Sequence, residues 1–354
     1  MKLQRLPVHD AQVPPAGSLN VDHVAHFVPD REAAAAALVR LGFSTTPFSE
    51  QFHRLQADGP LVPAGTGNRC VMLREGYLEF LTPFMDTPVA GQLRDAIARY
   101  TGVHLIAYGT ADAEADHARL SAAGFAPLPP VRLQREADAP SGTDDSAGTD
   151  DSAGTDDSAG TSARAGMPAS TGTTTVRFVV TRTPPGTMPE GRIQFCAHQT
   201  PEGVWQQRWL THPNRASGLQ RVFLVLADPA EAAARYARYA GVPSGLVFRP
   251  EGTEFVQQTA RGALHLMDTT AFHAQFDADR AIVLPSLPSL PSLPSLPSLP
   301  WIAGYELSSD DLAATRSTIE AAGTPVTALP DGRLWVVLPP ELGGFILFSA
   351  GSPA

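Results

Sequence analysis

The sequence has little cysteine and no long apolar run. Only Cys70 and Cys196 occur among the 354 residues, which is too few for a disulfide framework in a chain of this size. No uncharged apolar stretch approaches the ~20 residues that a membrane-spanning helix needs, and residues 1–17 contain no apolar segment typical of an export signal. We therefore expect a cytoplasmic protein that does not associate with a membrane.

Clusters of Lys and Arg are also missing, and the net charge is -10. A protein that binds a phosphate polyanion needs such clusters to displace the counterions, so we expect no nucleic-acid partner. Six of the excess acids lie in one repetitive stretch: Asp144, Asp145, Asp150, Asp151, Asp156 and Asp157. The folded part of the chain is therefore closer to neutral than the total charge suggests.

Several catalytic motifs are absent as well. The chain contains no GxSxG, no HExxH, no Walker loop, no GxGxxG after a strand and no CxxC pair, which argues against the chemistries that these motifs mark. Nucleophilic catalysis by Cys196 would need a paired base, for which His198 is the only local candidate.

Two segments of low complexity interrupt the chain. Residues 141–161 repeat the hexapeptide GTDDSA, which has no apolar side chain larger than Ala to bury. Residues 284–300 repeat LPS, where a Pro at every third position disfavours helix and sheet pairing. We interpret both as repeats inserted into loops and assign neither a catalytic role.

The remaining sequence repeats one order of elements four times, a strand followed by a helix and three strands. The expected first strands are 19–28, 102–112, 219–229 and 301–311, and the expected helices are 31–43, 113–125, 230–241 and 312–323. Within the first copy, the three later strands are expected at 43–48, 68–75 and 77–84. A Gly lies at or next to the end of each helical segment, as a left-handed cap requires.

This order, the openings DHVAHFVPD and VHLIAY, and the endings LGF and AGF resemble the glyoxalase-like, or vicinal oxygen chelate, family. The stretch FCAHQTPEGVWQQRWLTHPN resembles a segment of bacterial glyoxalase-like proteins. The resemblance implies an α+β fold in which four βαβββ modules pair into two curved-sheet domains. The expected divisions are an extension at 1–18, a double module at 19–212 with an inserted loop at 141–166, and a second double module at 213–350 with an inserted loop at 284–300.

The resemblance also implies a place for a divalent metal, held by the first and last strands of two paired units. The matching residues are His23, Glu79, His104 and Gln194. Imidazole nitrogen with carboxylate and amide oxygen suits Fe, Mn, Ni or Zn and leaves positions for a chelating substrate.

The spacing of His104 raises a question about this set. His23 lies seven residues before Asp30, whereas His104 lies eight before Asp112. Because strand side chains alternate, His104 faces away unless a bulge restores it, and Leu105 is the position in register with His23. His198 competes as a ligand, since it lies on the same strand face as Gln194 with Cys196 between them.

Further candidates lie near these ligands. Glu79 and Glu202 are the candidate catalytic acids or bases, and Asn68, Arg69, His198 and Trp205 are the candidate substrate-binding residues. Gly65, Gly67 and Asn68 could instead only shape a turn. The second double module has no comparable set, because His265 alone among its equivalent positions binds metals strongly.

We therefore expect a metal-dependent enzyme of the lyase, isomerase or dioxygenase type that acts on a small oxygen-chelating substrate. The alternatives are a metal-free module that binds a small molecule, and a scaffold that interacts through its repeats. The expected partner is a small-molecule substrate, and a homodimer is left open.

Overall fold

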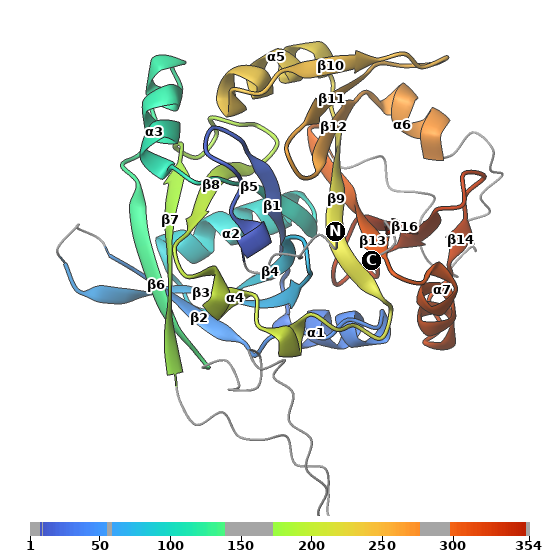
Figure 1. Ribbon diagram of the computed structural model, residues 1–354, viewed down its shortest axis with the longest axis horizontal. Coiled ribbons are helices and arrows are strands. Elements are labelled where there is room, and N and C mark those ends of the chain that lie inside the picture. Colours follow the sequence, from blue (N-terminus) through green and yellow to red (C-terminus); the bar gives the residue numbers. More distant parts are fainter. Residues whose placement is uncertain (1–7, 9, 55–58, 139–172, 277–297, 352–354) are drawn as a thin grey trace, which may run out of the picture.

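The structure, a computed structural model, describes residues 8, 10–54, 59–138, 173–276 and 298–351 and repeats one βαβββ unit four times (Figure 1). The first unit comprises β1 (Asn20–Phe27), α1 (Arg31–Arg40), β2 (Ser49–Arg54), β3 (Leu61–Met72) and β4 (Tyr77–Pro83). The second comprises β5 (Gly102–Gly109), α3 (Ala113–Ala122), β6 (Val131–Asp138), β7 (Thr173–Arg182) and β8 (Arg192–His198). The third comprises β9 (Ala216–Val225), α5 (Pro229–Ala240), β10 (Ser244–Val247), β11 (Glu254–Gln258) and β12 (Ala263–Met267). The fourth comprises β13 (Trp301–Ser309), α7 (Leu312–Ala321), β14 (Thr327–Ala328), β15 (Leu334–Val337) and β16 (Phe345–Ala350).

Strand pairing follows the same rule in every unit. The first strand runs parallel to the last strand, and the first strands of neighbouring units run antiparallel, β1 with β5 and β9 with β13. The α+β fold of four paired βαβββ modules is therefore confirmed. The two halves share one sheet, joined between β5 and β13 at the pair Val103 and Ile302.

The four helices of the units begin and end in the same way. At each N-terminus an Asp side chain accepts a backbone N–H of the first turn; these residues are Asp30, Asp112, Asp228 and Asp311. Beyond each C-terminus a Gly adopts a left-handed backbone; these residues are Gly42, Gly124, Gly241 and Gly323. The sequence pattern therefore specifies these helices locally.

Other elements differ from expectation. The strand expected at 43–48 is wrong, and β2 begins at Ser49 instead. The Thr46 backbone N–H donates to Cys70 O and its hydroxyl accepts from Cys70 N, while Pro47 has no N–H to give to a ladder. Two unpredicted helices, α2 (Pro88–Arg99) and α6 (Thr269–Phe276), link the units within each half.

The inserted repeats lie mostly beyond the described part of the chain. Asp138 at the end of β6 pairs with Thr173 at the start of β7, so the acidic repeat at 141–161 connects two adjacent strands. Most of the LPS repeat is likewise outside the described residues, between α6 and β13. The predicted boundary near residue 212 stays a prediction.

The first strands have one face in a central core and the other on a concave surface. The central core contains side chains from all four units, among them Val24, Ile106, Leu224 and Leu307. The opposite face of β4, β1, β5 and β8, here called the N-terminal concave face, receives α2, whose Leu93 packs in a cluster with Ala25 and Leu105. In the second half, α6 packs on the corresponding concave surface, where its Phe272 and Phe276 lie against other aromatic rings.

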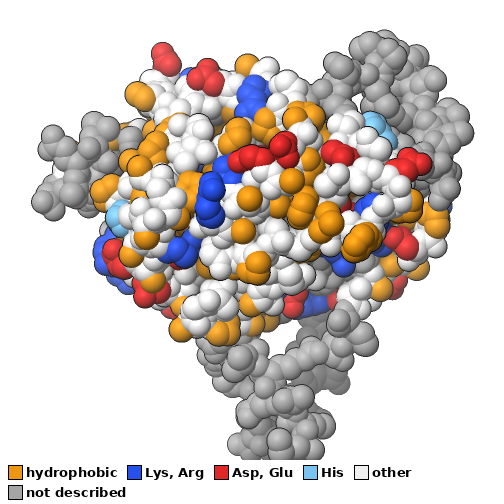
Figure 2. Space-filling view, turned by 90° about the horizontal axis from the view of Figure 1, so that it is seen from above, with side chains coloured by type: hydrophobic (Ala, Val, Ile, Leu, Met, Phe, Trp, Pro, Cys, Tyr) orange, Lys and Arg blue, Asp and Glu red, His pale blue; other side chains and the backbone are white. Residues whose placement is uncertain are grey.

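The outer surface shows no dominant charge on the face seen in Figure 2, where acidic and basic side chains are interspersed among apolar and neutral ones. Among the described residues, no helix combines the length and the apolar character required to cross a lipid bilayer.

His26 connects the two halves in the central core. Its Nδ1 donates to Leu342 O at 2.8 Å, and its Nε2 accepts from the Tyr305 hydroxyl at 3.1 Å. The side chain is fully buried, and burial lowers the pKa of His26 to about 4. The imidazole is therefore neutral in the folded protein.

This burial predicts a loss of stability in mild acid. As the pH falls from 6.5 to about 4, His26 takes up a proton in the unfolded chain but not in the folded one, so the free energy of unfolding decreases. A His26→Gln variant keeps a donor and an acceptor, and should reduce the slope of that free energy by up to about 1.4 kcal/mol per pH unit. Urea denaturation across this range, with His117→Gln on α3 as control, checks this. An unchanged slope in His26→Gln would contradict it.

Candidate functional site

Polar side chains gather on the N-terminal concave face. Asp22 and His23 come from β1 and Glu79 from β4, and all three are buried. Cys196 and His198 come from β8, and their side chains are also almost inaccessible. Buried groups of this kind require partners, so their arrangement identifies the candidate site.

A β-bulge places Asp22 in this group. In the ladder between β1 and β5, Val21 pairs with Tyr108 and His23 pairs with Ala107, so Asp22 is the extra residue. A bulge interrupts the alternation of side chains and re-aims one of them. The Asp22 carboxylate lies over Gly109, where a side chain carbon would come within 3.3 Å of Asp22 Oδ1, so the glycine provides the space.

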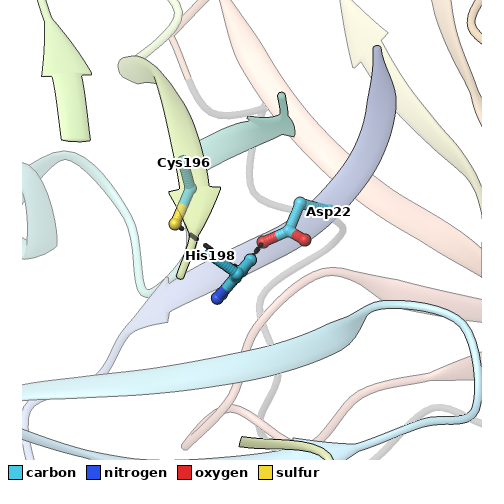
Figure 3. A group of neighbouring side chains, drawn as sticks. All are labelled: Asp22, Cys196 and His198. Carbon is cyan, nitrogen blue, oxygen red and sulfur yellow. Dashed lines mark hydrogen bonds and ion pairs between the residues drawn. The ribbon is translucent and has the colours of Figure 1, made fainter. Parts of the chain in front are cut away.

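Asp22 Oδ2 accepts hydrogen bonds from two imidazoles. His23 Nδ1 lies 2.7 Å away and His198 Nε2 lies 3.1 Å away. The Cys196 Sγ is 3.6 Å from the same His198 Nε2, and Figure 3 shows the three side chains pointing toward one another from β1 and β8. One buried carboxylate therefore connects both sides of the site.

The charges in this network stabilise one another. Burial alone would raise the pKa of Asp22, but the attraction and hydrogen bonds of His198 and His23 outweigh it and lower that pKa. Burial alone would lower the pKa of His198, but its interactions with Cys196 and Asp22 raise that pKa well above the ordinary value. Burial raises the pKa of the Cys196 thiol, against the opposing effect of His198. Without a bound ion, the network therefore favours a His198 imidazolium paired with the Asp22 carboxylate, beside a neutral Cys196 thiol.

His23 faces Glu79 with its other ring nitrogen. The distance from His23 Nε2 to Glu79 Oε2 is 4.0 Å, and Asn68 Nδ2 donates a hydrogen bond to Glu79 Oε1. Asn68 thus fixes the carboxylate while Asp22 fixes the imidazole. Two side chains of ligand type are held face to face, each by a partner of its own.

Aromatic rings line one side of this site. Tyr77 stacks on His23 with ring centroids 4.3 Å apart, and Trp205 meets His198 edge-on at 4.8 Å. Trp205 follows α4 (Pro201–Val204) and is buried among Cys70 and other apolar side chains. These rings shield the polar group from water on that side.

The strand register defines the positions equivalent to His23 and Glu79 in the second unit. The pairs are His23 with Ala107, Ala25 with Leu105, Ala25 with Glu79, and Ala107 with Gln194. The approximate twofold relation of β1 and β5 therefore matches Leu105 to His23 and Gln194 to Glu79. Gln194 lies in the same cross-strand row as His23, through Ala107. Because β8 is two strands from β1, the two residues are about 10 Å apart.

His104 is not brought to this group. A second irregularity between Ala25 and His26 does leave His104 as a bulged residue, but its ring stacks on Phe27 and Tyr100. Its Nε2 donates to Tyr100 O at 2.7 Å. Phe27 is four residues beyond His23 along β1, about 13 Å, so this expected ligand lies away from the His23–Glu79 pair.

Two other candidates also lie away from the site. Arg69 points to the opposite face of β3, where it lines a small hollow beneath α1 and approaches Thr46 O at 3.4 Å and Glu32 Oε2 at 4.0 Å. Glu202 is exposed in α4, and within the described part of the chain no contact joins it to His23 or Glu79.

The second half has a different interior. His265 Nδ1 lies 2.6 Å from Glu254 Oε1, and its ring lies beside Phe223. The surrounding cluster is aromatic, with Phe345 and Trp335 stacked at 4.1 Å. That the second double module carries no set like that of the first stays a prediction.

Sequence reasoning missed Asp22 and Tyr77. Strict alternation places Asp22 on the opposite face to His23, and only the bulge reverses that placement. Tyr77 was not singled out, because an aromatic residue is common in a strand. It precedes Glu79 by two residues, however, and therefore shares its face.

Comparison with known proteins shows the family to which the chain belongs. The family described as "Glyoxalase-like domain" matches residues 21–240, which is more than half of the sequence. The chain belongs to the glyoxalase-like domain family, and its α+β modules have the vicinal oxygen chelate fold. No curated protein matches it.

Two solved structures with low sequence identity show the same fold, and a third is also similar to this chain. A hypothetical protein from Staphylococcus aureus aligns with a TM-score of 0.52 and 11% identity, over 94% of this chain and 100% of that one. A fusion protein of a xylose isomerase-like TIM barrel with a 4-hydroxyphenylpyruvate dioxygenase aligns at 0.50 and 12%, over 96% of this chain and 51% of that one. A mutant of 4-hydroxymandelate synthase from Streptomyces coelicolor aligns at 0.48 and 14%, over 95% and 94%.

Removal of the shared carboxylate should destabilise the protein strongly. Asp22→Ala leaves two buried imidazoles without their acceptor, and loss of one partner from a buried ion pair costs about 3–5 kcal/mol. Denaturant unfolding measures this difference. The control is Asp310→Ala, which breaks an exposed pair with Arg74 and should cost no more than about 1 kcal/mol. Equal losses in the two variants would show that Asp22 is not the structural centre of the site.

Proposed function

We propose that this chain is a metal-dependent enzyme that acts on a small oxygen-chelating substrate at the N-terminal concave face. The observation that supports this best is the buried pair of His23 and Glu79, whose facing atoms are 4.0 Å apart. Such a separation is a little wider than two donors of one ion require, and a small closure of Glu79 toward His23 would form two ligand bonds of about 2.0–2.2 Å.

The donor types fit a borderline divalent ion. Imidazole nitrogen and carboxylate oxygen suit Fe, Mn, Ni or Zn, and two protein ligands leave room for a substrate with two oxygens. Gln194 occupies the position that matches Glu79, while Leu105 replaces the second imidazole. The bound ion would act as a Lewis acid that stabilises negative charge on substrate oxygen.

The chain's own residues would orient and protect this centre. Asp22 holds the ring of His23 and Asn68 holds Glu79, so both donors are oriented before any ligand arrives. Tyr77 and Trp205 exclude water from one side. Asn68, His198 and Trp205 are the side chains that would contact the substrate.

Proton transfer would involve Glu79, because its carboxylate faces His23 Nε2, whereas the Asp22 carboxylate is engaged by the hydrogen bonds of two imidazoles. Glu202 could serve only if α4 moved, since it is exposed on that helix. Lyase, isomerase and dioxygenase chemistry all use an ion that binds substrate oxygen, so the proposal covers the type of centre and not one reaction.

One observation favours the metal-free alternative. Asp22 Oδ2 already accepts hydrogen bonds from His23 and His198, so the ring of His23 is held in place without an ion beside Glu79. A protein that only binds a small molecule on the concave face would use the same walls and the same polar row.

Metal analysis of the purified full-length chain tests the proposal. We expect at least about one equivalent of a transition metal after reconstitution, and a loss of at least about tenfold in affinity for one ion in His23→Ala and in Glu79→Ala. Elemental analysis with competition by a chelator gives both values.

A matched control is Glu75→Ala, which removes an exposed carboxylate two residues from the β4 strand. It should leave metal content unchanged. Less than about a tenth of an equivalent in the wild type would favour the metal-free module.

A further inference from the structure

The side chains of Asp22, Cys196 and His198 form a cluster next to, but separate from, the His23–Glu79 pair. We propose that these three side chains are a second metal site, one that contains sulfur and takes a zinc-type ion. It is separate because His23 Nδ1 faces Asp22 while His23 Nε2 faces Glu79. The two sites therefore lie on opposite sides of one imidazole.

The distances in the cluster fit a tetrahedral ion. One donor atom from each of the three residues lies within 4.8 Å of the other two. With bonds of about 2.0–2.3 Å, the donors around a tetrahedral zinc are about 3.3–3.8 Å apart. The Cys196 Sγ to His198 Nε2 distance is 3.6 Å, and the His198 Nε2 to Asp22 Oδ2 distance is 3.1 Å. Only small rotations of the side chains are needed.

Hydrogen bonding alone satisfies the cluster poorly. His198 Nε2 is within reach of both Cys196 Sγ and Asp22 Oδ2, but a single N–H can point at only one of them. A buried polar atom that is left without a partner costs free energy. An ion between the three side chains would bind sulfur, nitrogen and oxygen together.

The donor set selects the kind of ion. A thiolate with an imidazole and a carboxylate favours zinc and similar borderline ions over magnesium or calcium, which prefer oxygen donors. Binding would release the proton of the Cys196 thiol and the proton between His198 and Asp22 to solvent. Three protein donors leave the fourth position for water or a substrate atom, as in catalytic zinc sites.

Cobalt(II) is the probe, because it replaces zinc and its thiolate bond gives an absorption band from charge transfer. The full chain, freed of metal with a chelator, is titrated with cobalt(II) and its near-ultraviolet and visible spectra are recorded. We expect a sulfur-to-cobalt band together with the visible bands of a tetrahedral ion. We also expect Cys196→Ser to lose the sulfur band and to bind zinc at least about tenfold more weakly.

Cys70→Ser is the matched control, because Cys70 is the other buried cysteine of the chain and should leave the band intact. Circular dichroism and a second variant, Cys196→Ala, show whether a lost band reflects a lost ligand or a lost fold. If Cys196→Ser does not fold but Cys196→Ala folds and keeps the band, the proposal is overturned.

The outcomes separate this inference from the proposed function. Binding of cobalt without a sulfur band in the wild type overturns the second site and leaves the His23–Glu79 centre standing. A single bound cobalt per wild-type chain, with a sulfur band that survives in His23→Ala and Glu79→Ala, supports the second site and overturns the first. A band lost in Cys70→Ser but kept in Cys196→Ser also refutes the assignment to Cys196.

Discussion

The buried carboxylate of Asp22 is the interaction on which the candidate site depends. It accepts one hydrogen bond from an imidazole on its own strand and one from an imidazole on β8, so it connects the first unit to the second. An unpaired charge at full burial would be unstable, and the two histidines are what make its position tolerable. The geometry of His23, and through it the approach to Glu79, therefore follows from a single bulged residue on β1.

The two halves use one architecture for different interiors. Each pairs its first strands antiparallel and receives a linking helix, α2 or α6, on its concave surface. In the first half, the helix covers only part of that surface and the polar group occupies the rest. In the second half, the rings of Phe272, Phe276 and Phe345 fill the space. Burial of these aromatic rings contributes stability, whereas the buried charges of the first half require partners to be tolerated.

Much of the fold could be predicted because its signals are local. Asp caps, Gly ends and alternating strands repeat in each unit, and they identify the four helices and most strands. The site was only partly predictable, because it depends on register. His23 and Glu79 follow from the resemblance to the glyoxalase-like family, and Asn68 from its polar side chain beside a predicted strand. The bulge at Asp22 and the turning of His104 toward Tyr100 arise instead from pairing between distant segments. No single stretch of sequence encodes such irregularities.

The hairpin formed by β6 and β7 has a consequence for how the chain tolerates insertions. Asp138 and Thr173 are paired neighbours, so whatever connects them starts and ends at one fixed point. The entropy of closing a flexible loop grows only with the logarithm of its length, about 0.6 kcal/mol per doubling. Residues can therefore be inserted between β6 and β7 at little thermodynamic cost.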